Sequence, residues 1–242
     1  MRKSLKALAA LLTYPTADMQ QAAAEIGRAI GTEQAVPPRI RDRLAPLIAE
    51  LATGDIYDLQ ERYVLLFDRT RSLSLHLFEH VHGESRDRGQ AMIDLKALYE
   101  KNGLLISTPE LPDFIPLFLE FLSTLPAAEA HELLDQPAHI FAALAERLRK
   151  RQSPYESVFR ALVALAGSKP GADVVSALLQ EPDADATDLA ALDAAWEDEP
   201  VTFGPGAGNS CKDGLIARIR AGRRPAPDMP AAPAARPVLP RH

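Results

Sequence analysis

The chain has 242 residues, 47% hydrophobic and 25% charged, so it is long enough to fold around a substantial core. Its formal net charge of −6 lacks the basic excess with which nucleic-acid-binding proteins neutralise phosphates, so we expect no nucleic-acid partner. Its only cysteine, Cys211, excludes an internal disulfide, which fits a reducing compartment such as the cytoplasm.

The hydrophobic residues are mostly Ala and Leu, and aromatic residues make up only 6% of the chain, which favours helices over strands. We therefore expect an all-α protein. Near the start, two basic residues precede the apolar run from Leu5 to Leu12, as in a signal peptide, but Lys6 interrupts this run and no small-residue cleavage site follows. No stretch approaches the ~20 consecutive apolar residues of a membrane-spanning helix, so we expect neither a signal peptide nor a membrane segment.

Apolar residues recur at helical spacing along most of the chain, in stripes that predict the buried faces of amphipathic helices. Helix boundaries are indicated by proline, glycine and N-cap residues, as at Pro38, Gly54 and Asp55, and Asn102-Gly103 predicts a helix C-terminus. We expect roughly ten helices with short connections, arranged as a single multi-helix bundle. The stripes are Met19 to Ile30, Ile40 to Leu51, Ile56 to Phe67, Met92 to Tyr99, Phe114 to Leu122, Leu133-Leu134, Ile140 to Leu148, Val158 to Val163 and Val174 to Leu179.

One segment breaks this pattern. Leucines at positions 73, 75 and 77 alternate with Ser74 and His76, and this period of two predicts an extended segment rather than a helix. Gly83 closes the stretch before a polar run opens the next helix. We expect an irregular loop that lines a groove between helices.

The segment from His76 to His80 matches the H-x-x-E-H pattern of inverted zinc peptidases, in which two histidines bind zinc and the glutamate acts as base. A zinc-dependent hydrolase using His76, Glu79 and His80 is therefore an alternative function. Against it, the alternating leucines disfavour the regular helix that would align both histidines, and no third-ligand motif follows. A polar loop whose histidines form hydrogen bonds is the simpler interpretation.

The composition changes in the C-terminal part. From Glu181 to Pro200 every charged residue is acidic, whereas basic residues are in excess from Asn209 onward. The segment between them is rich in glycine, and beyond Pro225 prolines interleave with alanines. We therefore expect a helical domain over residues 1–203 and, over residues 204–242, a linker, a short basic helix and a disordered Pro/Ala-rich tail.

Two segments carry a family resemblance. Glu61–Arg69, which reads ERYVLLFDR, and Leu77–Met92, which reads LFEHVHGESRDRGQAM, resemble the delta subunit, or NarJ-type assembly chaperone, of molybdenum-dependent nitrate reductase. The resemblance extends to Glu110–Asp113, similar to the E-x-P-D element of the wider TorD-like redox-enzyme maturation chaperones, and to Trp196–Phe203. It covers roughly Leu8 to Phe203.

This resemblance implies an all-helical, non-enzymatic chaperone in the cytoplasm. Such a chaperone binds the N-terminal region of the apo catalytic (alpha) subunit, keeps it competent for insertion of the molybdenum cofactor and iron–sulfur clusters, and then dissociates. It holds no cofactor of its own. Direct contact with proteins of molybdenum cofactor biosynthesis stays open, as does the alternative of a permanent structural subunit.

Two positions depart from the family pattern. The motif begins at Leu77, so His76 stands outside it. The wider family usually has histidine after the P-D pair, whereas this chain has Phe114. The substitution leaves a packing role at that position but no protonatable side chain.

A client helix would lay its apolar face into a groove between helices, with charged residues at the rim fixing its register. Aromatic and leucine side chains of the two motifs are the expected apolar wall, although core packing is an equal interpretation for Phe67 and Leu77. The wall comprises Tyr63, Phe67, Leu77 and Phe78, and the expected polar contacts are Glu79, His80, His82, Glu84, Arg86 and Asp113.

The charge inversion near the C-terminus predicts one further contact. The acidic stretch from Glu181 to Glu199 complements a basic client peptide, and the basic tail from Asn209 complements the same stretch. We expect the tail to occupy this surface when no client is bound.

Overall fold

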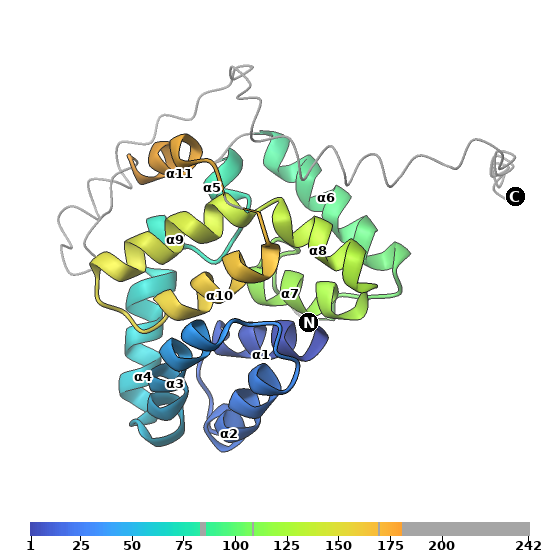
Figure 1. Cartoon of the computed structure of the whole chain (residues 1–242). Coiled ribbons are helices and arrows are strands. Elements are labelled where there is room, and N and C mark those ends of the chain that lie inside the picture. Colours follow the sequence, from blue (N-terminus) through green and yellow to red (C-terminus); the bar gives the residue numbers. More distant parts are fainter. Residues whose placement is uncertain (83–85, 108, 169, 181–242) are drawn as a thin grey trace, which may run out of the picture.

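Helices form where the apolar stripes predict them, and the all-α prediction is confirmed (Figure 1). The computed structural model describes residues 1–82, 86–107, 109–168 and 170–180, and this part of the chain contains eleven α-helices and no strand. The α-helices are Arg2–Leu11 (α1), Ala17–Thr32 (α2), Pro38–Thr53 (α3), Ile56–Tyr63 (α4), Glu79–His82 (α5), Arg86–Lys101 (α6), Ile115–Thr124 (α7), Ala127–Asp135 (α8), Ala138–Lys150 (α9), Glu156–Ala166 (α10) and Ala172–Leu179 (α11). A π-helix, Val64–Asp68 (η1), continues α4, and a 3-10 turn, Arg71–Leu73 (η2), follows it.

The helix ends have the local causes that the sequence indicates. Asp55 caps α4, because its carboxylate accepts a hydrogen bond from the backbone N–H of Tyr57 at 2.9 Å. Pro38 occupies the first turn of α3, where the missing N–H costs nothing. Gly103 follows α6 with a φ of 80°, a left-handed conformation that glycine adopts without strain.

Helix α1 lies at the centre of the molecule and packs against α7 (Figure 1). The apolar run that resembles a signal peptide forms this helix, and Leu5, Leu8 and Leu12 are fully buried. The Arg2 guanidinium donates to the carbonyl oxygen of Leu125 at 3.2 Å, so α1 begins where α7 ends. The end of α1 therefore lies toward the start of α7.

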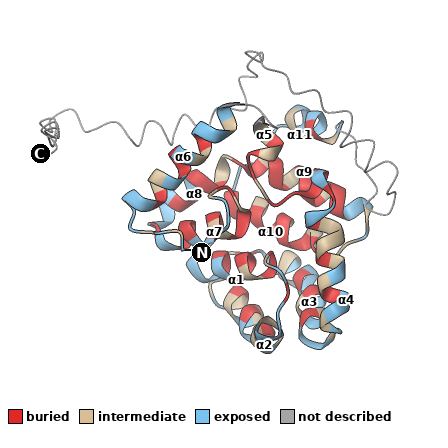
Figure 2. Cartoon of the chain, turned by 180° about the vertical axis from the view of Figure 1, so that it is seen from behind, coloured by how far each residue is buried: buried red, intermediate tan, exposed pale blue. Residues whose placement is uncertain are grey.

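Figure 2 shows the core, which α1, α7, α9 and α10 surround with their buried faces. Helices α2 and α3 pair with each other on one side of this core, and α11 packs against α9. No helix in the described ranges is long and apolar enough to cross a membrane.

The segment with alternating leucines is extended only in part. Residues 74–76 are non-helical and His76 forms an isolated antiparallel bridge with Phe114, but α5 begins at Glu79. The three leucines at positions 73, 75 and 77 are buried in the core, so they do not line a groove. The alternating pattern therefore corresponds to a loop whose leucines are packed into the core.

Several predictions concern residues that the structure does not describe. The acidic stretch Glu181 to Glu199, the glycine-rich linker, the short basic helix and the Pro/Ala-rich tail all lie outside the described residues, as does the proposed domain boundary at 203. Glu84 also lies outside them, and the description does not extend to the side chains of His82 and Arg86.

Candidate functional site

Asp113 joins the two motif loops of the chain. It precedes α7, and its carboxylate is fully buried. One carboxylate oxygen accepts a hydrogen bond from the backbone N–H of Phe78 at 3.0 Å, and the other lies 3.1 Å from Nδ1 of His76. A buried carboxylate is stable only with such partners, so Asp113 fixes the loop that carries His76 and Phe78.

The backbones of the same two loops are also paired. The N–H of Leu77 donates to the carbonyl of Asp113 at 3.0 Å, and the N–H of Ile115 donates to the carbonyl of Leu75 at 2.8 Å. These bonds create the short bridge between His76 and Phe114, whose ring centroids lie 5.5 Å apart. The E-x-P-D element and the start of the Leu77–Met92 motif thus form one rigid unit.

His76 supplies the imidazole beside Asp113. Burial alone would lower the pKa of His76, but the hydrogen bond and the charge of Asp113, with a contribution from Glu79, raise this pKa above its ordinary value; the charge of Arg88 opposes the rise. The sequence places His76 outside the family motif and indicates that Phe114 removes a protonatable group from this position. Position 114 itself carries no protonatable side chain, but the imidazole of His76 on the facing loop lies beside the ring of Phe114.

The zinc-hydrolase alternative fails on the positions of its three side chains. His76 precedes α5, so it does not share a helix with His80 as the H-x-x-E-H geometry requires. His76 contacts Asp113, the ring of His80 lies 2.8 Å from the carbonyl oxygen of Ser74, and Glu79 forms an ion pair with Arg88 at 3.0 Å. The three groups therefore point to three separate partners.

The predicted apolar wall divides into core and near-surface residues. Leu77 and Phe78 are fully buried and offer no surface to a partner in this conformation. Tyr63 and Phe67 are also buried, but they lie directly beneath the surface of α4 and η1. The hydroxyl of Tyr63 donates to the carbonyl oxygen of Leu12 at 2.9 Å, which ties α4 to the end of α1.

A row of aromatic rings runs beneath this surface. The centroids of Tyr14 and Tyr63 lie 5.6 Å apart, those of Tyr63 and Phe67 lie 5.1 Å apart, and those of Phe67 and Tyr155 lie 5.0 Å apart, all in edge-to-face arrangements. Edge-to-face pairs stabilise beyond their buried area. The row fixes α4 and η1 against the end of α1 and the start of α10.

A groove opens above this row. Its volume is about 220 Å³, and we call it the Tyr14 groove. Tyr14 is 46% exposed, whereas Val64 and Leu65 are half-buried. Its lining comprises Tyr14, Gln60, Glu61, Val64, Leu65 and Arg69. The last four belong to the ERYVLLFDR motif, and Gln60 directly precedes it.

The E-x-P-D element reaches the same region. Burial raises the pKa of Tyr63, and the charges of Tyr155, Glu110 and Asp68 raise it further. Glu110 and Asp68 are both exposed. Their charges therefore act on Tyr63 from the surface of the protein.

Sequence reasoning missed the residues of this groove as candidates. Glu61 and Arg69 stand at the two ends of the motif, and both side chains are exposed. Tyr14 belongs to none of the motifs, and only the packing of α1 brings it next to Tyr63. The helical spacing of Glu61 and Val64 was the available signal, because residues three apart share a helix face.

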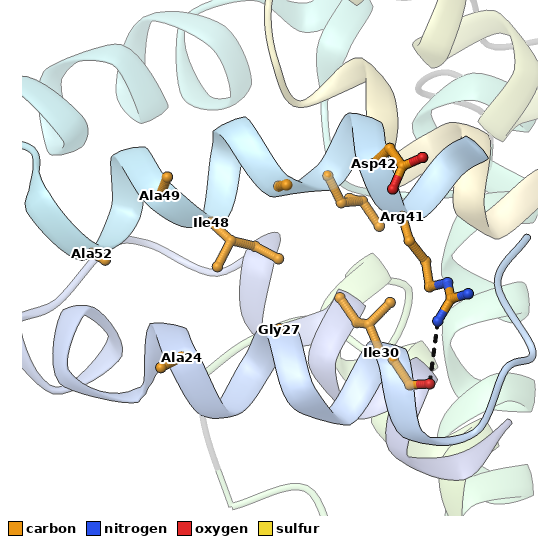
Figure 3. A pocket seen from close by; sticks show the side chains of 11 residues that line it. Ala24, Gly27, Ile30, Arg41, Asp42, Ile48, Ala49 and Ala52 are labelled. Atoms are coloured by element: carbon orange, nitrogen blue, oxygen red, sulfur yellow. Dashed lines mark hydrogen bonds between the residues drawn. The ribbon is translucent and has the colours of Figure 1, made fainter. Parts of the chain in front are cut away.

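A second, larger groove lies between α2 and α3 (Figure 3). Its volume is about 590 Å³, and small side chains such as Ala24, Gly27 and Ala49 line much of it. Arg41 spans one end, where Nη1 donates to the carbonyl oxygen of Gly31 at 3.3 Å. This α2–α3 groove contains no residue of the three motifs that meet around Asp113 and Tyr63.

Comparisons with known proteins agree with this arrangement. The sequence profile described as "Nitrate reductase delta subunit" matches residues 15–161. The chain is 45% identical over 206 residues to the nitrate reductase molybdenum cofactor assembly chaperone NarJ of Escherichia coli (strain K12), covering 85% of this chain and 86% of that protein. It is 47% identical over 165 residues to the probable nitrate reductase molybdenum cofactor assembly chaperone NarW of the same strain, covering 66% of this chain and 71% of that protein.

A solved structure shares the fold. The crystal structure described as a redox enzyme maturation protein from Archaeoglobus fulgidus superposes with a TM-score of 0.52 and 26% sequence identity, covering 69% of this chain and 94% of that one. The segment that matches the family profile, residues 15–161, contains both motif loops and every residue that lines the Tyr14 groove except Tyr14 itself. Because the profile covers more than half of the chain, this protein belongs to the nitrate reductase delta subunit family.

Proposed function

We propose that this chain is a system-specific assembly chaperone of a respiratory nitrate reductase. It binds the N-terminal region of the apo catalytic subunit, assists insertion of the molybdenum cofactor and assembly of the complex, and is not part of the final enzyme. The observation that carries this proposal is the 45% identity to NarJ, which extends over 85% of this chain and 86% of that protein.

Binding rather than catalysis is what the site supports. Asp113 and His76 hold two loops together, His80 lies against a backbone carbonyl, and Glu79 forms an ion pair with Arg88. These groups act by positioning the motif loops. The chain works as a chaperone and not as an enzyme, in keeping with its family.

The predicted contact residues take two roles in this proposal. Tyr63 and Phe67 support the Tyr14 groove from below, and Leu77, Phe78, His80 and Asp113 keep the neighbouring loop in shape. Half-buried Glu79 is able to reach a client directly. His82, Glu84 and Arg86 stay proposed client contacts on the strength of the motif alone.

The setting of this activity follows from the proposed client. Because the apo catalytic subunit receives its cofactor before the enzyme is complete, the chaperone works in the cytoplasm and needs no cofactor of its own. Contact with proteins of molybdenum cofactor biosynthesis is a second proposed interaction, since insertion brings both to the same subunit.

Co-purification tests the proposal. A tagged chain is expressed with the catalytic subunit in cells that cannot make the molybdenum cofactor, and we expect it to capture that subunit. Deleting the N-terminal segment of the catalytic subunit should abolish capture. Failure to capture the apo subunit contradicts the proposal, and retention of the chain in mature, cofactor-loaded enzyme would instead identify a permanent structural subunit.

A further inference from the structure

A basic surface lies on α10 and on two of the helices that pack against it, α9 and α3 (Figure 1). At its centre are two glutamates, of which Glu146 on α9 pairs with Arg149 of the same helix. Oε1 of Glu156 on α10 lies 3.0 Å from Nε of Arg160 and 3.8 Å from Nη1 of Arg43 on α3. Nη2 of Arg160 also lies 3.5 Å from Glu146, so these ion pairs connect all three helices.

Positive charge exceeds negative charge on this surface. The charge of Glu146 is offset by its own partner on α9, whereas two arginines share Glu156. Lys150 is exposed in the last turn of α9 and forms no ion pair with any residue that the structure describes. The side chain of Arg43 is 66% exposed. We call Arg43, Lys150 and Arg160 the Lys150 surface, and its excess of positive charge attracts an acidic partner.

The acidic stretch from Glu181 to Glu199 begins beside this surface. Arg147, three residues before Lys150 on α9, donates from Nη2 to the carbonyl oxygen of Leu178 at 2.6 Å, near the end of α11. Residues three apart lie within one turn of a helix. Three residues of extended chain span about 11 Å at most, so Glu181 cannot be farther than this from Leu178. The stretch therefore starts close to the turn of α9 that carries Lys150.

The acidic stretch also has the charge that the Lys150 surface attracts. From Glu181 to Pro200 every charged residue is acidic. The stretch is covalently joined to α11, and a short flexible tether gives an effective concentration on the order of millimolar. Tethering therefore favours the acidic stretch over a separate acidic protein as the occupant of this surface.

We propose that the acidic stretch docks on the Lys150 surface, where its carboxylates pair with Lys150, Arg160 and Arg43. The surface is then closed to other acidic partners of the chaperone. Exposed ion pairs are individually weak and are screened by salt, so the contact is reversible and depends on several charges together. The stretch has more carboxylates than the surface has excess positive charges, so others stay available to the basic tail.

Carbodiimide cross-linking of the full chain tests this contact. The reagent joins an amine directly to a carboxylate that touches it, and Lys150 supplies the amine of the surface. At low salt, mass spectrometry of the monomeric product should identify bonds between Lys150 and the acidic stretch. Lys96 is the matched control, because it is exposed on α6, on the opposite side of the molecule from α3 (Figures 1 and 2), and should form no such bond.

Trp196, the only tryptophan of the chain, reports the same contact without a label. It lies within the acidic stretch, so its fluorescence anisotropy should be high when the stretch is docked. The anisotropy should fall as salt rises from about 0.01 M to about 1 M, because the screening length shortens from ~30 Å to ~3 Å. Lys150→Glu should lower the anisotropy at low salt toward its high-salt value, whereas Lys96→Glu should leave it unchanged.

Three results would each overturn the proposal. They are cross-links from Lys150 no more abundant than those from Lys96, cross-links that form only in dimers, and an anisotropy that neither salt nor Lys150→Glu changes. The first would leave the Lys150 surface open to a separate acidic partner, and the second would assign it to a second copy of this chain. Capture of the apo catalytic subunit does not depend on this contact, so the chaperone function stands in each case.

Discussion

Asp113 has no contact with solvent, and both oxygens of its carboxylate have polar partners. The backbone N–H of Phe78 and the imidazole of His76 both approach its oxygens within 3.1 Å. This one buried carboxylate thus connects two loops that are distant in the sequence, since Phe78 and His76 lie 35 and 37 residues before it. The loss of either partner leaves a buried charge without compensation, which is costly.

His76→Ala should therefore destabilise the protein in a way that depends on pH. Because the folded-state pKa of His76 is raised, the ion pair contributes fully below the unfolded-state pKa of ~6.5 and is lost as the pH rises through the folded-state pKa. We expect the variant to lose about 2 kcal/mol of unfolding free energy at pH 6 and clearly less at pH 9. Urea denaturation at both pH values measures the difference.

His139→Gln provides a control of opposite sign. Burial lowers the pKa of His139, so the unfolded chain takes up this proton first and the wild-type residue costs stability as the pH falls below ~6.5. Relative to the wild type, this variant should gain stability between pH 7 and pH 5. A loss in His76→Ala that is the same at pH 6 and pH 9 would argue against a charged pair with Asp113.

At the scale of elements, Arg147 anchors α11. The side chain lies on α9 and is buried, and its guanidinium donates to the carbonyl oxygens of Ser72 and Leu178, each at 2.6 Å. One planar group thus links η2, α9 and α11. Lysine offers a single ammonium and does not reproduce this fork of donors.

Arg147→Met should destabilise the protein by about 3 kcal/mol, because it keeps the apolar stem but leaves two buried carbonyls unsatisfied. Arg147→Lys should recover only part of the loss. Chemical denaturation measures the stability, and hydrogen exchange should show faster exchange of the α11 amides. Arg149→Met on the same helix is the control: this arginine is exposed and pairs with Glu146, so its loss should leave the stability nearly unchanged. Equal effects of both Met variants would contradict the anchoring role.

The elements themselves could largely be predicted from the sequence. Apolar stripes, Pro38 and Asp55 place the helices because helix formation responds to local spacing and capping. The same spacing argument could have placed Arg147 on the buried face of its helix, between Leu144 and Leu148. A charged residue is rarely buried, however, so the usual rule argues against this position. The π-helix η1 has no such local signal.

At the scale of the whole molecule, the meeting of the motifs could not be predicted. It depends on the packing of α1 against α7 and on the contact between Tyr14, just after α1, and Tyr63 on α4. Sequence reasoning identified the motif residues but assigned Phe78 and Asp113 to a client surface and left Leu77 open between client contact and core packing, whereas all three are buried. Side-chain burial within a loop depends on long-range contacts that spacing does not encode.

The inverted charge of the C-terminal part leads to a prediction for the full chain. If the basic tail competes with a basic client for the acidic surface, deleting Asn209 to His242 should tighten binding of the client peptide at low salt and have little effect at high salt. Calorimetry at two salt concentrations measures this. Unchanged affinity at low salt would remove the competition.

The π-helix η1 changes which side chains face the surface. An α-helix that gains a single residue acquires a wider turn of this kind, and such turns are frequent at functional sites. Between the inward-facing Tyr63 and Phe67 the wide turn displays Val64, Leu65 and Leu66, all half-buried. The wide turn thus presents three adjacent apolar side chains toward the surface while Tyr63 and Phe67 stay packed in the aromatic row.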